Sequence, residues 1–249
     1  MSTAPFFAVV LLPMTVLALM IWERLAPNQP LPRSPGWYQR LALAYFLQLA
    51  VLVIGELVWA GWLRSWSLLH LERALAPWLG GLIAYFIWTG LFYGWHRWRH
   101  RNPWLWRIFH QLHHSPRRIE SLTAYYLHPL DYLSGSLLAS LVLFVLMGLG
   151  REAALFFLAY SVAVGFFIHA NIRVPRWVGY VIQTPDMHRV HHEYGRHDSN
   201  FADFVCWDML FGTYRNPQTP IHECGFDAEK EQQFFAMLKG RDVYREPPP

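Results

Sequence analysis

Residues 107–118 read RIFHQLHHSPRR and carry three histidines, His110, His113 and His114, with arginines on both sides. Spacings of three and four residues place the three side chains on one face of a helix. Imidazole is the commonest metal ligand in proteins, and it binds a metal in its neutral form. Nearby arginines disfavour the protonated form. The stretch therefore predicts a metal-binding helix.

The pattern occurs again on either side of this stretch. HRWRH at 96–100 gives an i,i+4 pair, and HRVHH at 188–192 repeats the spacing of the first stretch. We call the stretches at 96–100, 110–114 and 188–192 the first, second and third histidine boxes. A single zinc site uses three or four protein ligands, so the histidines of these three boxes suit two metal ions. We expect the two ions to lie about 4–6 Å apart, as in bridged two-metal sites. The predicted ligands are His96, His100, His110, His113, His114, His188, His191 and His192, with His169 and His128 added from the ends of apolar segments.

The identity of the metal stays open at this level. Nitrogen-rich sites suit iron, copper or zinc. The chain lacks the Glu-x-x-His pairs of soluble di-iron bundles and the His-Glu-x-x-His signature of zinc proteases. A haem held by two histidines is a further alternative, but one haem does not require doubled histidines in repeated boxes.

The composition predicts an all-α integral membrane protein. Hydrophobic residues make up 54% of the chain and charged residues only 15%, against about 25% in a typical soluble domain. About 20 apolar residues cross a membrane, which predicts four to five transmembrane helices. The net charge of +4 fits topology signals and attraction to anionic lipid, with no nucleic acid as partner. The predicted spans are Thr3–Trp22, Leu41–Leu63, Ala74–Trp95, Leu130–Leu149 and Glu152–His169.

Arginine-rich loops set the predicted orientation. The strongly basic segments 23–40 and 96–129 fall on one side of the membrane, and short loops rich in arginine favour the cytoplasm. All three boxes then form a cytoplasmic, histidine-rich helical cap. Glu56 is costly inside a span, and we expect it to serve a contact between helices. Gly94 and Gly165 are expected to permit close approach of helices.

The order of the boxes, His-x3-His, His-x2-His-His and His-x2-His-His, around paired apolar spans resembles the fatty acid hydroxylase/sterol desaturase superfamily of membrane di-iron enzymes. The resemblance covers roughly residues 80–214. It also rests on HHSPRRIESLTAYYLHPLD (113–131), TPDMHRVHHE (184–193) and DSNFADFVCWDMLFGTY (198–214). Glu120, Tyr126, Asp131, Phe201 and Ala202 depart from the superfamily pattern, which leaves the substrate class open.

The resemblance implies a catalytic domain at 71–214, preceded by N-terminal membrane helices (1–70) and followed by a cytoplasmic tail (215–249). It implies two iron ions, O2 as co-substrate, and hydroxylation, or less readily desaturation, of a membrane lipid such as an acyl chain or sterol. Electrons would come from a separate reductase, ferredoxin or cytochrome b5-like donor, because the chain has no nucleotide-binding fingerprint. The alternative is a non-enzymatic protein that binds or transports a transition metal.

Two further expectations concern the surroundings of the boxes. Four carboxylates are candidates to orient the ligand imidazoles by accepting their second ring N–H: Asp186, Asp198, Asp208 and Glu120. The substrate is expected to reach the metals from the bilayer through an apolar cleft between the third, fourth and fifth spans. The candidate lining residues are Phe92, Tyr93, Phe166 and Phe167.

Overall fold

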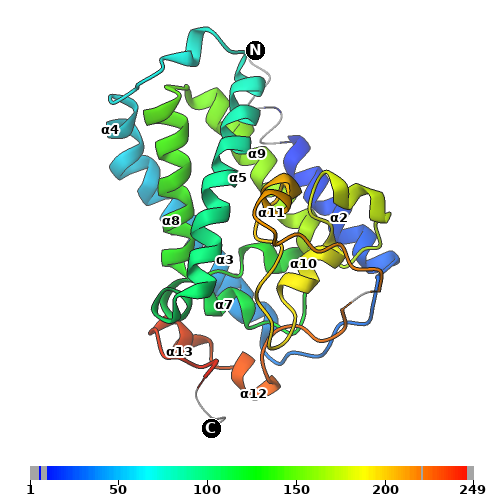
Figure 1. Cartoon of the computed structure of the whole chain (residues 1–249). Coiled ribbons are helices and arrows are strands. Elements are labelled where there is room, and N and C mark those ends of the chain that lie inside the picture. The colour runs from blue at the N-terminus through cyan, green and yellow to red at the C-terminus, as the bar shows by residue number, and fades with distance from the viewer. Residues whose placement is uncertain (1–5, 7–9, 220, 246–249) are drawn as a thin grey trace.

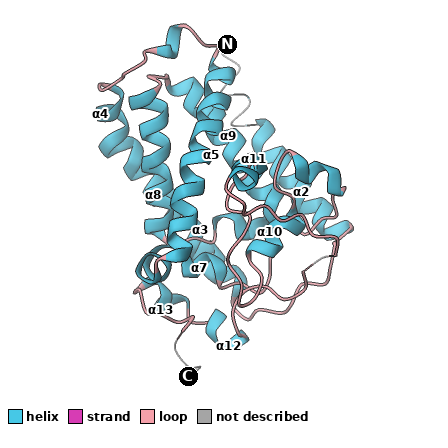
Figure 2. Cartoon of the chain, viewed as in Figure 1, coloured by secondary structure: helices cyan, strands magenta, loops and turns pink. Residues whose placement is uncertain are grey.

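The computed structural model describes residue 6 and residues 10–219 and 221–245. Within that part of the chain the structure is helical, with no strand and only two isolated bridges, Ile182–Phe204 and Glu193–Cys224 (Figure 2). The all-α class predicted from the sequence is confirmed for these residues.

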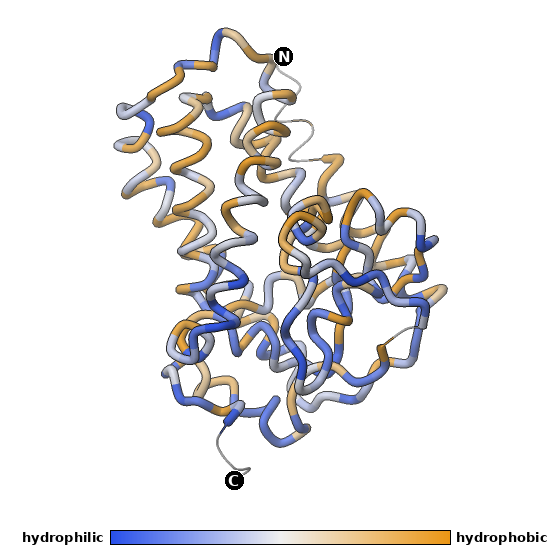
Figure 3. The backbone as a smooth tube through the Cα atoms, viewed as in Figure 1, coloured by the Kyte–Doolittle hydropathy of each residue, from blue (hydrophilic) through white to orange (hydrophobic). Residues whose placement is uncertain are grey.

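Four long segments form a bundle (Figure 1). The first is α3 (Trp37–Gly55), continued by the π-helical turn η2 (Glu56–Ala60) and by α4 (Gly61–Arg64). The second is α5 (Pro77–Arg101), which follows the short 3-10 turn η3 (Leu71–Arg73). The others are α8 (Pro129–Ser140) with its π-helical continuation η6 (Leu141–Leu146), and α9 (Arg151–His169). In Figure 3 the bundle is mostly hydrophobic and its lower end becomes hydrophilic.

Three segments are long and apolar enough to cross a membrane: Trp37–Arg64, Pro129–Leu146 and Arg151–His169. They correspond to the second, fourth and fifth predicted spans. Large apolar side chains such as Phe46, Leu49 and Leu57 are mostly exposed on the outer face of the first segment. Contiguous apolar surface of this kind marks contact with a membrane or a partner.

The first and third predicted spans are not among these three candidates. The third lies within α5, which is a 25-residue helix beside α9 but is not among the three apolar candidates. The first predicted span falls partly outside the described residues. Its described part includes α2 (Leu12–Leu25), which continues directly from the helical residues 10 and 11.

The contact between α5 and α9 depends on Gly81. A Cβ atom added there would lie 2.6 Å from the carbonyl oxygen of Ala153 and 2.8 Å from the Cβ of Phe156, both in α9. The expectation that Gly94 and Gly165 serve this purpose is wrong. An added Cβ at Gly94 meets nothing within 4 Å, and one at Gly165 meets only the Tyr125 hydroxyl at 3.9 Å.

We expect Gly81→Ala to destabilise the protein by roughly 1–3 kcal/mol, because the added methyl overpacks the α5–α9 interface. The matched control is Gly94→Ala on the same helix, which should be neutral or slightly stabilising, since alanine favours helix over glycine. Thermal unfolding of the purified variants in detergent measures both effects. Equal midpoints for the two variants would contradict the close packing at Gly81.

Short helices and loops form a cap at the histidine end of the bundle (Figure 1). The second box lies on a continuous run of α6 (Pro103–Leu105), the π-helical turn η4 (Trp106–His110) and α7 (Gln111–His114). The third box lies on α10 (Pro185–His191), which starts at the N-cap Thr184 and Pro185. The remaining cap elements are η5 (Ser121–Tyr125), η7 (Arg176–Tyr180), α11 (Val205–Leu210), α12 (Ala228–Glu231) and α13 (Phe234–Leu238).

The chain end packs into this cap. Phe234 and Met237 of α13 are almost fully buried in a cluster with Trp37, Trp106 and Leu112. The sequence of residues 227–239, DAEKEQQFFAMLK, predicts a short amphipathic helix on the cytoplasmic surface, and the structure differs from this expectation. The segment forms two short helices, and its buried side chains Phe234 and Met237 pack against α3 and the helix of the second box.

Candidate metal centre

The structure gathers nine histidines into two adjacent groups at the base of the bundle. In each group the potential ligand atoms all lie within 4.8 Å of one another. The five-histidine group contains His96, His100, His110, His114 and His191, and the four-histidine group contains His113, His169, His188 and His192. The groups adjoin where the rings of His114 and His192 stack with centroids 4.2 Å apart.

The second and third boxes each contribute to both groups. His110 and His114 belong to one group, whereas the intervening His113 belongs to the other. His191 and His192 separate in the same way. Neighbouring helical residues point about 100° apart, so a His-His pair at the end of a helix can serve two sites. The expectation that the three histidines of the second box share one face is therefore wrong for His113.

Hydrogen bonds at Nδ1 orient many of these rings. His96 Nδ1–H donates to the Phe201 carbonyl at 2.8 Å, and His191 Nδ1–H donates to the Ser199 carbonyl at 2.9 Å. His169 donates to the Gly165 carbonyl at 2.7 Å. Such contacts fix the tautomer and leave the Nε2 lone pair free for a metal.

Side chains orient two further rings. His110 Nδ1–H donates to Asp131 Oδ2 at 2.7 Å, and the buried Arg99 pairs with the other oxygen of that carboxylate. His188 Nδ1–H donates to Gln183 Oε1 at 2.9 Å. Each group thus has one ring held by a buried side chain.

The Nε2 atoms converge as ligands of one ion would. In the five-histidine group His110 Nε2 lies 2.8 Å from His96 Nε2 and 3.1 Å from His114 Nε2. In the four-histidine group the neighbouring Nε2–Nε2 distances are 2.8, 3.1 and 3.4 Å. Imidazole nitrogens about 2.1 Å from one metal at right angles are about 3 Å apart. His191 Nε2 is buried without a hydrogen-bond partner. Both groups therefore fit a metal ion.

Burial keeps these imidazoles neutral. Desolvation lowers the pKa of His113, His114 and His192 well below the ordinary value of 6.5, and neighbouring histidines lower it further. Desolvation also lowers the pKa of His191 to about 3. The neutral ring is the form that binds a metal.

His128 lies outside both groups. Its Nδ1 accepts a hydrogen bond from the Leu130 amide and caps α8, and its Nε2 lies 3.2 Å from the Leu238 carbonyl. Both ring nitrogens are thus engaged by the backbone. The expectation that His128 is a ligand is not met, because the residue serves as a helix cap.

The four carboxylates expected to orient the imidazoles are bonded to other groups. Asp186 accepts from Asn28, Asp198 pairs with Arg196 and Arg215 on the surface, and Glu120 accepts from Trp37, Arg24 and Arg118. Asp208 acts indirectly, because it accepts from the amides of Phe201 and Ala202 and so holds the loop whose Phe201 carbonyl orients His96.

Sequence reasoning missed three residues of the site: Asp131, Gln183 and His197. Asp131 lies in the first turn of α8, three residues after His128, and Gln183 lies five residues before His188. His197 packs its ring 4.7 Å from that of His114, and its buried Nε2 has no hydrogen-bond partner. Burial lowers the pKa of His197 to about 4. His197 lies ten residues before Trp207 and outside the three boxes, so no helical spacing marked it in the sequence.

We expect Gln183→Leu to weaken metal binding by the four-histidine group roughly 10- to 100-fold, because His188 loses the partner that sets its tautomer. Titration of the metal-depleted protein with Fe²⁺ measures the loss. The matched control is Gln39→Leu, at an exposed position outside the cap contacts. If both variants bind iron like the parent, Gln183 has no orienting role.

A cavity of about 780 Å³ extends from the histidines into the bundle. Five histidines from the two groups lie at its base. Apolar side chains from four segments line it, among them Trp59 of η2, Phe92 of α5, Leu143 of η6 and Leu158 of α9. The expected cleft between the third, fourth and fifth spans is present, and the second span, α3–η2, adds a further wall.

Phe92 is the one expected lining residue that faces this cavity. Tyr93 instead stacks on Phe211 and bonds to Thr213 at 3.0 Å. Phe166 is buried against Tyr125, and Phe167 is not part of the lining. Helical rotation turns these three side chains away from the cavity.

Comparison with known proteins agrees with the histidine arrangement. The family model for fatty acid hydroxylases matches residues 81–213, which is more than half of the chain and includes all nine grouped histidines. The chain belongs to the fatty acid hydroxylase family. No solved structure matches this family member.

Several curated proteins are similar to this family member. Ornithine lipid hydroxylase OlsE of Rhizobium tropici is 32% identical over 64% of the chain and 48% of its own length. Sphinganine C4-monooxygenase 1 of Arabidopsis thaliana is 25% identical over 56% of the chain and 55% of its own length. Cholesterol 25-hydroxylase of Homo sapiens is 27% identical over 75% of the chain and 71% of its own length. The chain spans about half the length of the first two.

Proposed function

We propose that this protein is a membrane-bound oxygenase that hydroxylates a C–H bond of a lipid. The observation that carries the proposal is the position of two neutral histidine groups at the base of an apolar cavity of about 780 Å³. Cavities of this size hold ligands with volumes of a few hundred Å³. The names of the relatives, which include lipid and sterol hydroxylases, support the same reaction class.

We assign one metal ion to each histidine group, with iron as the metal. The ligands would be His96, His100, His110, His114 and His191 for one ion, and His113, His169, His188 and His192 for the other. Two bound iron ions would supply the O2 chemistry that amino-acid side chains lack. In the overall reaction one oxygen atom would enter the C–H bond and the other would leave as water, with two electrons from a separate donor protein and two protons from solvent.

The chain's own residues orient and protect this centre. The Nδ1 hydrogen bonds hold the rings, and the buried Arg99–Asp131 pair keeps His110 in place. The apolar cavity walls hold a hydrocarbon chain and exclude water from the reacting carbon. Gly165 leaves room for that chain beside His169, since an added Cβ would meet only the Tyr125 hydroxyl, at 3.9 Å.

We further propose that four or five helices cross the membrane and that the cap lies in the cytoplasm. The basic segments 23–40 and 96–129 adjoin the histidine end of the bundle, as the orientation rule for arginine-rich loops requires.

The test uses the purified full-length protein. Iron per chain is measured first, and then O2 consumption with a reductant and total membrane lipid. We expect two iron ions per chain and lipid products heavier by one oxygen atom. Lipids of a deletion strain, compared with its parent by mass spectrometry, identify the product. A product heavier by no oxygen and lighter by two hydrogens would instead indicate desaturation.

The alternative of a metal-binding or transport protein predicts metal flux across proteoliposomes without O2 consumption. A transport path would need ligands along the spans. Among the described residues, both histidine groups instead lie together at one end of the bundle, and the cavity walls above them are mainly apolar.

A further inference from the structure

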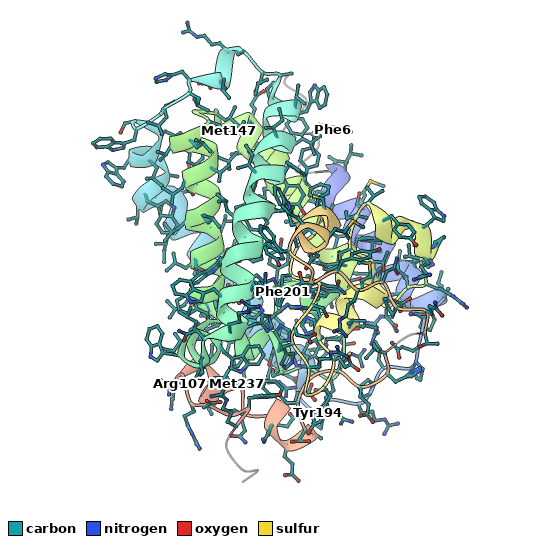
Figure 4. All side chains as sticks on the ribbon, in the orientation of Figure 1. Phe6, Arg107, Met147, Tyr194, Phe201 and Met237 are labelled. Atoms are coloured by element: carbon teal, nitrogen blue, oxygen red, sulfur yellow. The ribbon has the colours of Figure 1, made fainter. Side chains whose placement is uncertain are left out.

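The end of the cavity remote from the histidines is charged. Glu56 accepts hydrogen bonds from Arg64 at 3.1 Å and from Arg151 at 2.9 Å, and all three side chains line the cavity. Arg151 and His169 are the first and last residues of α9, which separates the two ends by about 27 Å. In Figure 4 Met147, which precedes Arg151 by four residues, lies at the upper end of the bundle, and Phe201, whose ring centroid is 5.5 Å from that of His96, lies well below it.

These three side chains leave positive charge unpaired. Two guanidinium groups share a single carboxylate oxygen, Glu56 Oε1. Each guanidinium has five N–H donors, so most of them remain free of Glu56. The side chains of Glu56 and Arg151 are 49% and 76% exposed. Exposed ion pairs are weak and rearrange readily, so an incoming anion can compete with Glu56 for both arginines.

At the histidine end of the cavity the lining arginine is Arg99, which is fully buried and pairs with Asp131. The histidines that line the cavity there are buried, and their Nε2 atoms point at one another at 2.8–3.4 Å, as ligands of a metal ion would. An end group that keeps contact with water therefore finds exposed guanidinium donors at the end formed by Arg64 and Arg151, where the Arg151 side chain is 76% exposed.

We propose that Arg64 and Arg151 bind the anionic end of a single-chain lipid, a carboxylate or a phosphate, while its hydrocarbon chain extends towards the histidine groups. Guanidinium groups match the geometry of both anions. This inference rests on the proposed function, because it names the class and the orientation of that enzyme's substrate. Oxidation would then occur far along the chain from the anionic end.

Binding of stearic acid and of methyl stearate to the full-length protein, measured by calorimetry in detergent without reductant, tests this inference. We expect Arg64→Gln combined with Arg151→Gln to weaken stearate binding roughly tenfold or more, because charge-assisted hydrogen bonds are lost. Methyl stearate, which has no charge, should bind both proteins equally. The matched control is Arg73→Gln, which changes an arginine of η3 outside the cavity.

Glu56→Gln gives an effect of opposite sign. It removes the carboxylate that competes for the arginines, so stearate should bind several-fold more tightly while methyl stearate is unchanged. If the ion pair between Glu56 and Arg151 only connects η2 to α9, the Glu56→Gln variant will weaken the binding of both ligands equally or change the binding of neither. Either result overturns the inference. Competition between stearate and oleoyl lysophosphatidate distinguishes a carboxylate end group from a phosphate end group. The ligand that binds more tightly identifies the preferred end group, and failure of both ligands to bind overturns the proposal.

The failure of this inference is separable from failure of the proposed function. Hydroxylation that persists unchanged in the double arginine variant would overturn only the anion site. Arginine-dependent stearate binding without any oxidised product in the iron-loaded protein would overturn only the oxygenase. When both hold, fatty acids of increasing chain length should be oxidised at a constant carbon number counted from the carboxylate.

Discussion

His113→Ala and His191→Ala are each expected to remove one metal ion and to reduce lipid hydroxylation at least about 100-fold, because the O2 chemistry needs both ions. His113 belongs to the four-histidine group and His191 to the five-histidine group. Each variant should therefore keep roughly one iron per chain. The membrane helices do not depend on the site, so both proteins should still insert.

Iron analysis and product formation on the purified variants measure these effects. The matched control is His222→Ala, because His222 is exposed and lies outside both groups. Loss of metal binding also removes the stabilisation that a ligand gives to the folded state, so a lower unfolding temperature is expected for His113→Ala and His191→Ala alone. Two retained iron ions in both variants would contradict the assignment of these ligands.

Gly165→Leu is expected to lower the hydroxylation of a long-chain lipid at least tenfold while leaving both metal ions in place. Gly165 lines the cavity one turn before His169, and the space around an added Cβ is open except for the Tyr125 hydroxyl at 3.9 Å. The leucine side chain would occupy the volume that the substrate chain needs next to the centre. Its backbone carbonyl would still accept the His169 hydrogen bond.

The matched control for this variant is Gly94→Leu, which adds the same side chain to the exposed side of α5. Product formation and iron content are measured for both proteins with the same lipid. A short-chain substrate should be less affected than a long-chain one if the cavity holds the chain. Equal activity of the two variants would show that the substrate does not pass Gly165.

Much of the candidate metal centre was predictable because its histidines lie in short sequence motifs. Local spacing on a helix fixes which residues share a turn, so the boxes at 96–100, 110–114 and 188–192 marked eight of the nine grouped histidines. His169 was also predicted, from its place at the end of an apolar span. Apolar length likewise predicted the three membrane-spanning candidates, because the thickness of a bilayer sets the length of a helix that crosses it.

The hydrogen-bond partners of those histidines were not predictable in the same way. Asp131 and Gln183 reach His110 and His188 only after α8 and the segment before α10 pack beside the second box. Carboxylates near the boxes in sequence, such as Asp186 and Asp198, point to other partners. Proximity along the chain is a poor guide to hydrogen bonding between segments, because the packing of helices decides which side chains meet.

The sequence by itself determined the helical class, the apolar segments and the set of imidazoles, since these depend on composition and on spacing within single helices. Only the tertiary structure decided that His113 and His114 serve different groups, that His128 caps a helix, and that one cavity joins the histidines to Arg64 and Arg151. The reason is geometric. A helix fixes the direction of each side chain relative to its own axis, but the crossing of helices far apart in sequence fixes what that side chain meets.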